Sequence, residues 1–130
     1  MQLSRTESVM STETINFSRH FQIWNYTVSH SELLLRSTKS AEFPTRIDVL
    51  FKGVKEFHLP TSFGGLSITV ASEAEVQKLC SLRQPLSFSK DVKVFKVQGD
   101  DFMGYVAALI VVCHEDEGEY NDPSFFSPQT

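Results

Sequence analysis

The residues of this chain that could do chemistry are concentrated near its C-terminus, where His114 precedes Glu115, Asp116 and Glu117. Imidazole and carboxylate groups are good ligands for divalent metal ions, so this run is a candidate metal site. Its spacing matches no recognised ligand motif, however, and neighbouring residues on an extended chain point to opposite sides. The sequence therefore predicts a solvated acidic strand end and no metal site.

A cysteine nucleophile is the second kind of chemistry to consider, because the chain has two cysteines, Cys80 and Cys113. Four histidines are available to activate a thiol: His20, His30, His58 and His114. Each cysteine lies in an apolar stretch that predicts burial, whereas reactive thiols lie in exposed, electropositive surroundings. A buried thiol behaves as a small hydrophobic group, so we expect neither cysteine to be catalytic.

Three shorter clusters contain residue types that are common in active sites. Ser29 to Glu32 places hydroxyl, imidazole and carboxylate side chains next to one another, but adjacency in sequence is not the spatial geometry of a catalytic triad. Asp100 and Asp101 could pair as acid and base, but Gly-Asp-Asp between two strands is also a common loop. Gly64 and Gly65 lack the lysine and the helix that follow a phosphate-binding loop. We predict no catalytic residue and no cofactor, and an enzyme is the less favoured class.

The basic residues do not indicate a nucleic-acid site. Lys90, Lys93 and Lys96 are the clustered cations, and on a strand Lys93 would face away from the other two. The whole chain has a net charge of -4. Because nucleic-acid binding depends on a continuous basic surface, we expect no nucleic-acid partner.

The charge is uneven along the chain. Residues 1–112 carry 12 basic and 11 acidic residues, whereas residues 113–130 carry five acidic residues and no basic one. Carboxylates beside aromatic rings can attract a basic partner over a distance and then hold it through apolar contacts. The predicted partner-binding residues are Glu115, Asp116, Glu117, Glu119, Tyr120, Asp122, Phe125 and Phe126. The expected partner is a protein with a basic surface.

The same acidic tail has a simpler interpretation as a disordered, solubilising terminus, because charged chain ends are often mobile. Its Phe125-Phe126 pair favours docking, either on the body of the protein or on a partner. Both interpretations stay open at this point.

An aromatic pair in the N-terminal half is a second candidate surface. Trp24 and Tyr26 share strand parity, so they could form an exposed aromatic platform or, with His30, the wall of a pocket. Such a pair is more often part of the core or a cross-strand packing unit.

Length and composition predict one globular domain. The chain has 130 residues, of which 41% are hydrophobic and 22% are charged. We expect a flexible polar leader at residues 1–18, a globular domain at 19–117 and an acidic, Pro- and Phe-containing tail at 118–130. The predicted fold is mainly β, in the α+β class: a single curved antiparallel sheet or partial barrel of about six to eight strands, with one helix packed on it.

Alternation of apolar and polar residues places most of the strands. The segments expected to be strands are 20–28, 32–37, 46–51, 54–59, 66–70, 86–89 and 92–97. Gly64-Gly65 is expected to form a tight turn between two strands, because glycine tolerates positive φ angles. A phase change between Val94 and Phe95 predicts a bulge.

Two segments depart from this alternation. Ser72 and Glu75 have the spacing of a capping box, which predicts a helix over residues 73–82. Residues 102–113 are apolar at most positions, so we expect a central strand with both faces covered, or alternatively a buried helix.

The compartment is inferred from what the sequence contains at its start and in its apolar runs. Residues 1–18 lack the apolar stretch of a signal peptide, and the longest apolar run, Tyr105 to Cys113, is too short for a spanning helix. Two cysteines do not indicate a disulfide framework. We therefore expect a cytoplasmic location and no membrane partner.

Three segments, Trp24 to His30, Leu33 to Ser37 and Arg46 to Phe51, resemble a group of small uncharacterised bacterial proteins that have no assigned activity. In its size, acidity and β content the chain also resembles immunity proteins that neutralise toxins. The resemblance implies an inhibitor of a toxin, but it carries no functional residue to a position of this sequence.

The leading hypothesis is a non-enzymatic protein-interaction module, immunity- or antitoxin-like, whose acidic C-terminal patch meets a basic partner. A second hypothesis is a small-ligand or enzymatic pocket inside the curved sheet, formed by Trp24, Tyr26 and a histidine. A third is a structural homo-oligomer whose sheet edges pair between subunits.

Overall fold

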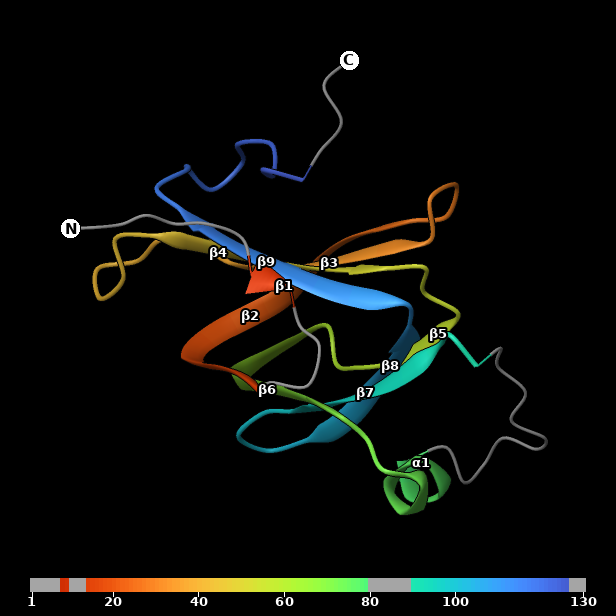
Figure 1. The fold of residues 1–130 in the computed structure, drawn as a ribbon. Coiled ribbons are helices and arrows are strands. Elements are labelled where there is room, and N and C mark those ends of the chain that lie inside the picture. The colour runs from red at the N-terminus through yellow and green to blue at the C-terminus, as the bar shows by residue number, and fades with distance from the viewer. Residues whose placement is uncertain (1–7, 10–13, 80–89, 127–130) are drawn as a thin grey trace.

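The computed structural model describes residues 8–9, 14–79 and 90–126. The described residues form one antiparallel sheet of nine strands and one α-helix (Figure 1). The elements are β1 (Ser8–Val9), β2 (Ile15–Thr27), β3 (Glu32–Ser37), β4 (Arg46–Lys52), β5 (Glu56–His58), β6 (Ser62–Val70), α1 (Glu73–Leu79), β7 (Lys93–Gln98), β8 (Met103–Ala108) and β9 (Ile110–Asp116). The strand order is β1-β9-β4-β3-β2-β6-β7-β8-β5, so the sheet does not close. The predicted curved antiparallel sheet with one helix is confirmed.

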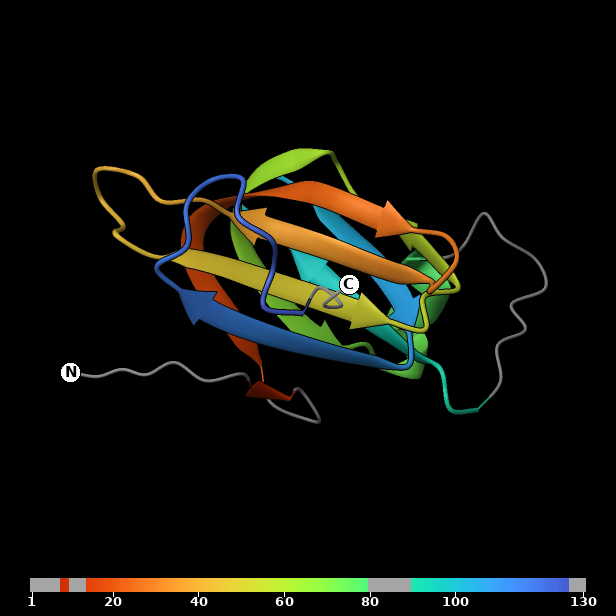
Figure 2. The same ribbon diagram turned by 90° about the horizontal axis from the view of Figure 1, so that it is seen from above.

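The long strand β2 folds the sheet over on itself. Its C-terminal half pairs with β3 over Gln22 to Thr27, and its N-terminal half pairs with β6 over Ile15 to Gln22. Strands β8 and β9 are separated by Leu109 alone, yet β8 pairs with β5 and β7 whereas β9 pairs with β1 and β4. Leu109 is thus a corner between two half-sheets, which lie face to face in both views (Figures 1 and 2).

Apolar side chains fill the space between the half-sheets. The core contains the fully buried rings of Phe21, Phe51 and Phe95, packed with leucine, isoleucine and valine from both halves. Large rings that need no hydrogen-bond partner suit a dry interior of this kind. The second hypothesis of the sequence analysis needs an open concave face. In the described residues that face is covered by the core, including the rings of Phe21, Phe51 and Phe95.

Helix α1 covers the outer face of β7 and β8. Val76 and Leu79 pack against Val94 and Tyr105 of these strands. The predicted capping box is confirmed, because the Glu75 amide donates to the Ser72 hydroxyl at 3.2 Å and the Ser72 amide donates to the Glu75 carboxylate at 3.0 Å. The described helix ends at Leu79, and the remainder of the predicted helix lies outside the described residues.

The predicted turn at Gly64-Gly65 is wrong, because both glycines lie inside β6. They face a bulge in β2, where Phe17 pairs with Leu66 but the next pair joins His20 to Gly64. Gly65 has a φ of 76°, which an L side chain rarely adopts. The glycines therefore bend the strand at the bulge and do not reverse it.

The central strand predicted over residues 102–113 is divided at Leu109, which is 44% exposed, into β8 and β9. Its expected coverage on both faces is confirmed, since five consecutive residues from Gly104 to Ala108 are buried. The bulge predicted between Val94 and Phe95 is wrong. The pairing of β7 with its two neighbours is regular, and both residues are buried because α1 covers one face while the core covers the other.

The sheet begins earlier in the chain than expected. Strand β2 starts at Ile15, and Ser8–Val9 pairs with β9, so parts of the predicted leader belong to the sheet. The other residues of the leader, the strand predicted at 86–89, and Cys80 lie outside the described residues.

Candidate functional site

The outer face of β3, β4 and β9 contains two buried arginines. Arg36 and Arg46 are 1% and 3% exposed. The register of the sheet places Arg36 opposite Asp48, and these two side chains form a two-pronged ion pair. The distances are 2.7 Å from Nε to Oδ1 and 3.1 Å from Nη2 to Oδ2. Such a fork-to-carboxylate geometry is the strongest form of a protein ion pair.

Arg46 forms a second pair of the same kind with Asp116, which lies opposite it on β9. The distances are 3.0 Å from Nε to Oδ1 and 2.9 Å from Nη2 to Oδ2. Burial alone would raise the pKa of Asp116, but hydrogen bonds from Arg46 and from the Gly118 amide, with the charge of Arg46, hold that pKa below its ordinary value. Burial acts to lower the pKa of Arg46, yet its contact with Asp116 and the charges of Asp48 and Asp122 raise it overall.

The remaining N–H groups of both arginines bind the backbone of the C-terminal segment 117–126, which we call the docked tail. Arg36 Nη1 donates to the carbonyl oxygens of Tyr120 and Asp122 at 3.0 and 3.2 Å. Arg46 donates to the carbonyl oxygens of Glu119 at 3.2 Å, Asp122 at 2.7 Å and Pro123 at 3.2 Å. These five hydrogen bonds hold the tail against the sheet. In Figure 2 the tail passes in front of the strands.

Aromatic contacts complete the docking. Tyr120 meets Trp24 edge to face with 5.0 Å between ring centroids, and Arg36 lies 4.6 Å above the same Trp24 ring. Phe125 stacks on His114 at 3.9 Å. Phe126 packs against the outer apolar cluster of Leu34, Leu50 and Val112. The tail therefore covers this face with both rings and backbone.

Six of the eight predicted partner-binding residues belong to the docked tail and Asp116 lies beneath it on the outer face, whereas Glu115 lies on the other side of β9, so the carboxylates differ in role. Asp116 belongs to the buried arginine pair. Glu115 accepts a hydrogen bond from the Thr45 hydroxyl at 2.5 Å and lies 3.9 Å from Arg19. Glu119 pairs with Lys39 at 2.9 Å. Asp122 accepts a hydrogen bond from the Glu119 amide.

Three side chains of this surface point to solvent. Tyr120 and Phe125 are 54% and 55% exposed despite their contacts with the body. Glu117 is exposed and makes no hydrogen bond or ion pair within the described part of the chain. Two exposed rings and an exposed carboxylate therefore belong to the same docked tail.

The acidic character extends to neighbouring loops at the same end of the sheet. The carboxylates of Glu42, Asp100 and Asp101 are exposed, and they too make no ion pair with any described residue. The opposite end, where β2 turns into β3 and β4 leads to β5, carries the exposed Lys52 and Lys55. The two ends of the molecule differ in charge, and their loops lie on opposite sides of Figure 1.

Trp24, Tyr26 and His30 do not form the predicted platform or pocket. A register shift between Ile23 and Asn25 gives Trp24 an extra position in β2, so Trp24 and Tyr26 contact opposite faces of the sheet. Trp24 packs with the docked tail, whereas Tyr26 contacts Phe57, which packs on the core. His30 is exposed in the turn after β2.

The other chemical candidates are dispersed. His114 and Asp116 lie on the outer face, while Glu115 lies on the other side of β9. Among the described residues, no group of three or more His, Cys, Asp or Glu side chains converges as a metal site would require. The Nδ1 atom of His114 is buried without a described hydrogen-bond partner. Cys113 is buried in the core.

Arg36, Arg46 and Asp48 are the site residues that sequence reasoning missed. Each interrupts a strand that is otherwise rich in apolar residues, and that interruption was the available signal. Opposite charges at matching positions of two adjacent strands predict a cross-strand pair once the register is known. The register, however, comes from the sheet and not from either strand alone.

Comparison of the chain with protein-family models, with curated proteins and with solved structures finds no match. Within the described residues, no helix is long and apolar enough to cross a membrane.

Proposed function

We propose that this protein is a non-enzymatic interaction module, and that its docked tail presents a preformed acidic and aromatic surface to a basic protein partner. The observation that carries the proposal is the exposure of Tyr120 and Phe125 on a segment whose backbone is fastened by two buried arginines. Exposed tyrosine and phenylalanine rings held in a fixed position are typical anchors of protein interfaces.

The ordering of the docked tail by the two arginines should increase its affinity for a partner. A free tail would lose much conformational entropy when it became ordered on a partner, and that loss would weaken binding. Here the hydrogen bonds from Arg36 and Arg46 order the tail before any partner arrives. Binding energy from the two rings is then available for the complex itself.

The carboxylates supply attraction over longer distances. Glu117 on the tail and Glu42 on the β3–β4 loop are exposed and unpaired among the described residues. The Lys39–Glu119 ion pair joins the loop to the tail, so these two carboxylates belong to one acidic end. Such a field accelerates encounter with a basic protein and weakens as salt is added. An inhibitor that covers a basic site, as immunity and antitoxin-like proteins do, is the narrower role that we propose.

The experiment begins with capture of partners from the native host's lysate at low salt, followed by purification of the retained protein. Its affinity is then measured by calorimetry for the wild type and for two double variants of equal charge change. Glu42→Lys with Glu117→Lys reverses the acidic end, and Glu73→Lys with Asp91→Lys is the matched control at other exposed acidic positions.

We expect the first variant to bind about threefold to tenfold more weakly at low salt, and the control to bind as the wild type does, because each exposed ion pair contributes up to about 1 kcal/mol. The difference should shrink at high salt. Tyr120→Ala should weaken binding about tenfold or more at any salt concentration. Equal affinities for the two double variants, together with an unchanged Tyr120→Ala variant, would overturn the proposal.

A further inference from the structure

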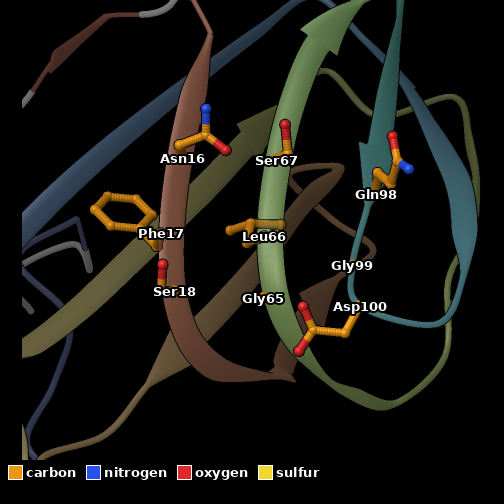
Figure 3. A pocket seen from close by; sticks show the side chains of 9 residues that line it. All are labelled: Asn16, Phe17, Ser18, Gly65, Leu66, Ser67, Gln98, Gly99 and Asp100. Carbon is orange, nitrogen blue, oxygen red and sulfur yellow. The ribbon is translucent and has the colours of Figure 1, made fainter.

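A polar groove of about 410 Å³ crosses the outer face of the other half-sheet (Figure 3). It lies over β2, β6 and β7 and ends at the turn between β7 and β8. The lining residues are Asn16, Phe17, Ser18, Gly65, Leu66, Ser67, Gln98, Gly99 and Asp100. Neither α1 nor the docked tail is part of its lining.

The floor of the groove is a row of side chains that can both donate and accept hydrogen bonds. The register places Asn16 opposite Ser67 and Ser67 opposite Gln98, so the three lie side by side on adjacent strands (Figure 3). No described residue makes a hydrogen bond to any of their side chains. Within the described residues, the row is therefore open to a ligand at three neighbouring positions.

Asp100 supplies the charge at one end of the groove. Its amide donates to the carbonyl oxygen of Gly64 at 2.8 Å, which fixes the turn against β6. Its carboxylate occupies the space that side chains of Gly64 and Gly65 would need, since a Cβ atom there would lie 2.9 Å from Oδ2 and 2.6 Å from Oδ1 respectively. No described residue makes a hydrogen bond or an ion pair to this carboxylate.

Asp100 is the one ionisable residue among the nine that line the groove. Asp101, the next residue, is also exposed and has no ion-pair partner among the described residues. The groove therefore repels anions and favours a cation. A planar group with several N–H donors would meet the carboxylate through two of them and the amide and hydroxyl oxygens of the row through others.

We propose that this groove binds the guanidinium group of an arginine side chain presented by the partner. This inference names a second contact of that partner and so rests on the proposed function, but small-molecule probes test it without the partner. Asp100 forms the two-pronged ion pair, and Gln98 and Ser67 accept further hydrogen bonds from the same group. An ammonium group, with its three donors around one point, matches the carboxylate less completely.

The test is an NMR titration of the full-length protein with N-acetylarginine amide, with N-acetyllysine amide and N-acetylcitrulline amide as the comparison probes. Citrulline has nearly the shape of arginine but no charge. We expect the arginine probe to shift the side-chain amide signals of Asn16 and Gln98, and to bind at least about fivefold more tightly than either comparison probe.

Two variants locate the site. Asp100→Asn should reduce the affinity for the arginine probe at least about fivefold, whereas Asp91→Asn, an exposed acid outside the groove lining, should leave it unchanged. Gln98→Ala should produce a smaller reduction. Absence of shifts at Asn16 and Gln98, or equal binding of the citrulline probe, would overturn the inference.

The two proposals fail in different ways. If the arginine probe does not bind but reversal of Glu42 and Glu117 still weakens the partner complex, the groove inference is wrong and the proposed function stands. The opposite outcome has two parts: charge reversal at Glu42 and Glu117 leaves the affinity for the partner unchanged, and the arginine probe binds the wild type but not Asp100→Asn. In that case the tail surface is not the main contact, and the groove inference stands.

Discussion

The two outer coverings of the sheet are held by different forces. Helix α1 rests on β7 and β8 through apolar side chains such as Val76 and Leu79. The docked tail rests on β3, β4 and β9 mainly through Arg36 and Arg46, whose N–H groups bind its backbone carbonyls. The helix covering depends mainly on apolar area removed from water, with one part-exposed ion pair between Lys96 and Glu75, and the tail covering depends mainly on buried charge.

This difference predicts different behaviour. Hydrophobic contact is tolerant of small displacements and is nearly independent of pH. Breaking a fully buried ion pair is strongly destabilising, because it leaves an unpaired charge away from water. The tail should therefore be docked in one defined position, and acid should weaken it through the partly buried Asp116, whereas acid reaches the helix through the more exposed Glu75. A binding surface needs a fixed position. A helix that only shields a strand from water does not need one.

The largest effect is expected for Arg36→Met. The variant leaves Asp48, which is 1% exposed, without its arginine, and a broken buried pair costs about 3–5 kcal/mol in the free energy of unfolding. Chemical denaturation measures it. The double variant Arg36→Met with Asp48→Leu should recover much of that loss, because it also removes the unpaired carboxylate of Asp48. A double variant no more stable than the single one would mean that charge is not the reason for the loss.

A smaller effect is expected for Asp116→Asn, since the carboxylate is 28% exposed and Arg46 keeps its carbonyl partners. Losing the charge-assisted bonds should lower the free energy of unfolding by about 1–2 kcal/mol. The matched control, Asp91→Asn, replaces an exposed acid and should change stability by less than about 0.5 kcal/mol. If Asp116→Asn and Asp91→Asn changed the free energy of unfolding equally, the ion pair of Asp116 with Arg46 would not stabilise the docked tail.

Acid should release the tail through the same residue. The pKa of Asp116 is held below its ordinary value of about 3.9, so its contribution to stability is complete above that pH and is lost as the pH falls through the native pKa. In denaturation series between pH 2 and 7, the wild type should lose more stability below about pH 4 than Asp116→Asn does. If the free energy of unfolding fell equally with pH in the wild type and in Asp116→Asn, the Arg46–Asp116 pair would not be the cause of the pH dependence.

The helix covering should show the smallest effect. Val76→Ala removes two methyl groups from a half-buried side chain, which should lower the free energy of unfolding by about 1 kcal/mol. That loss should be the same at pH 5 and pH 7, because the packing of Val76 is apolar. If the loss of stability in Val76→Ala depended on pH, apolar packing would not be what holds the helix on the sheet.

Local sequence patterns were sufficient for much of the fold. Aromatic and β-branched composition predicted β2, a short apolar run predicted β3, and alternation predicted β4, while the spacing of Ser72 and Glu75 predicted the helix start. Each of these signals lies within a few neighbouring residues. The errors at Gly64-Gly65 and at Leu109 have one cause: whether a glycine or a leucine turns, bends or continues a strand depends on the strand opposite.

The candidate site was partly predictable for the same reason. The acidic and aromatic composition of the tail indicated docking or partner binding before any register was known. The residues that hold it, Arg36 and Arg46, could be found only by pairing β3 with β4 and β4 with β9. The groove over β2, β6 and β7 has even less local signal, since Asn16, Ser67 and Gln98 are ordinary surface residues until the sheet aligns them.

The most direct test of the central claim, that two buried arginines hold the tail in place before any partner binds, is amide hydrogen exchange of the tail in the wild type and in Arg46→Met. The amides of Gly118, Glu119 and Asp122 donate to Asp116, Asp122 and Glu119 respectively in the docked tail. In the wild type they should exchange at least about tenfold more slowly than in an unfolded chain, and Arg46→Met should remove that protection while the core amides of β4 stay protected. Unprotected tail amides in the wild type, or protection that survives Arg46→Met, would contradict the claim.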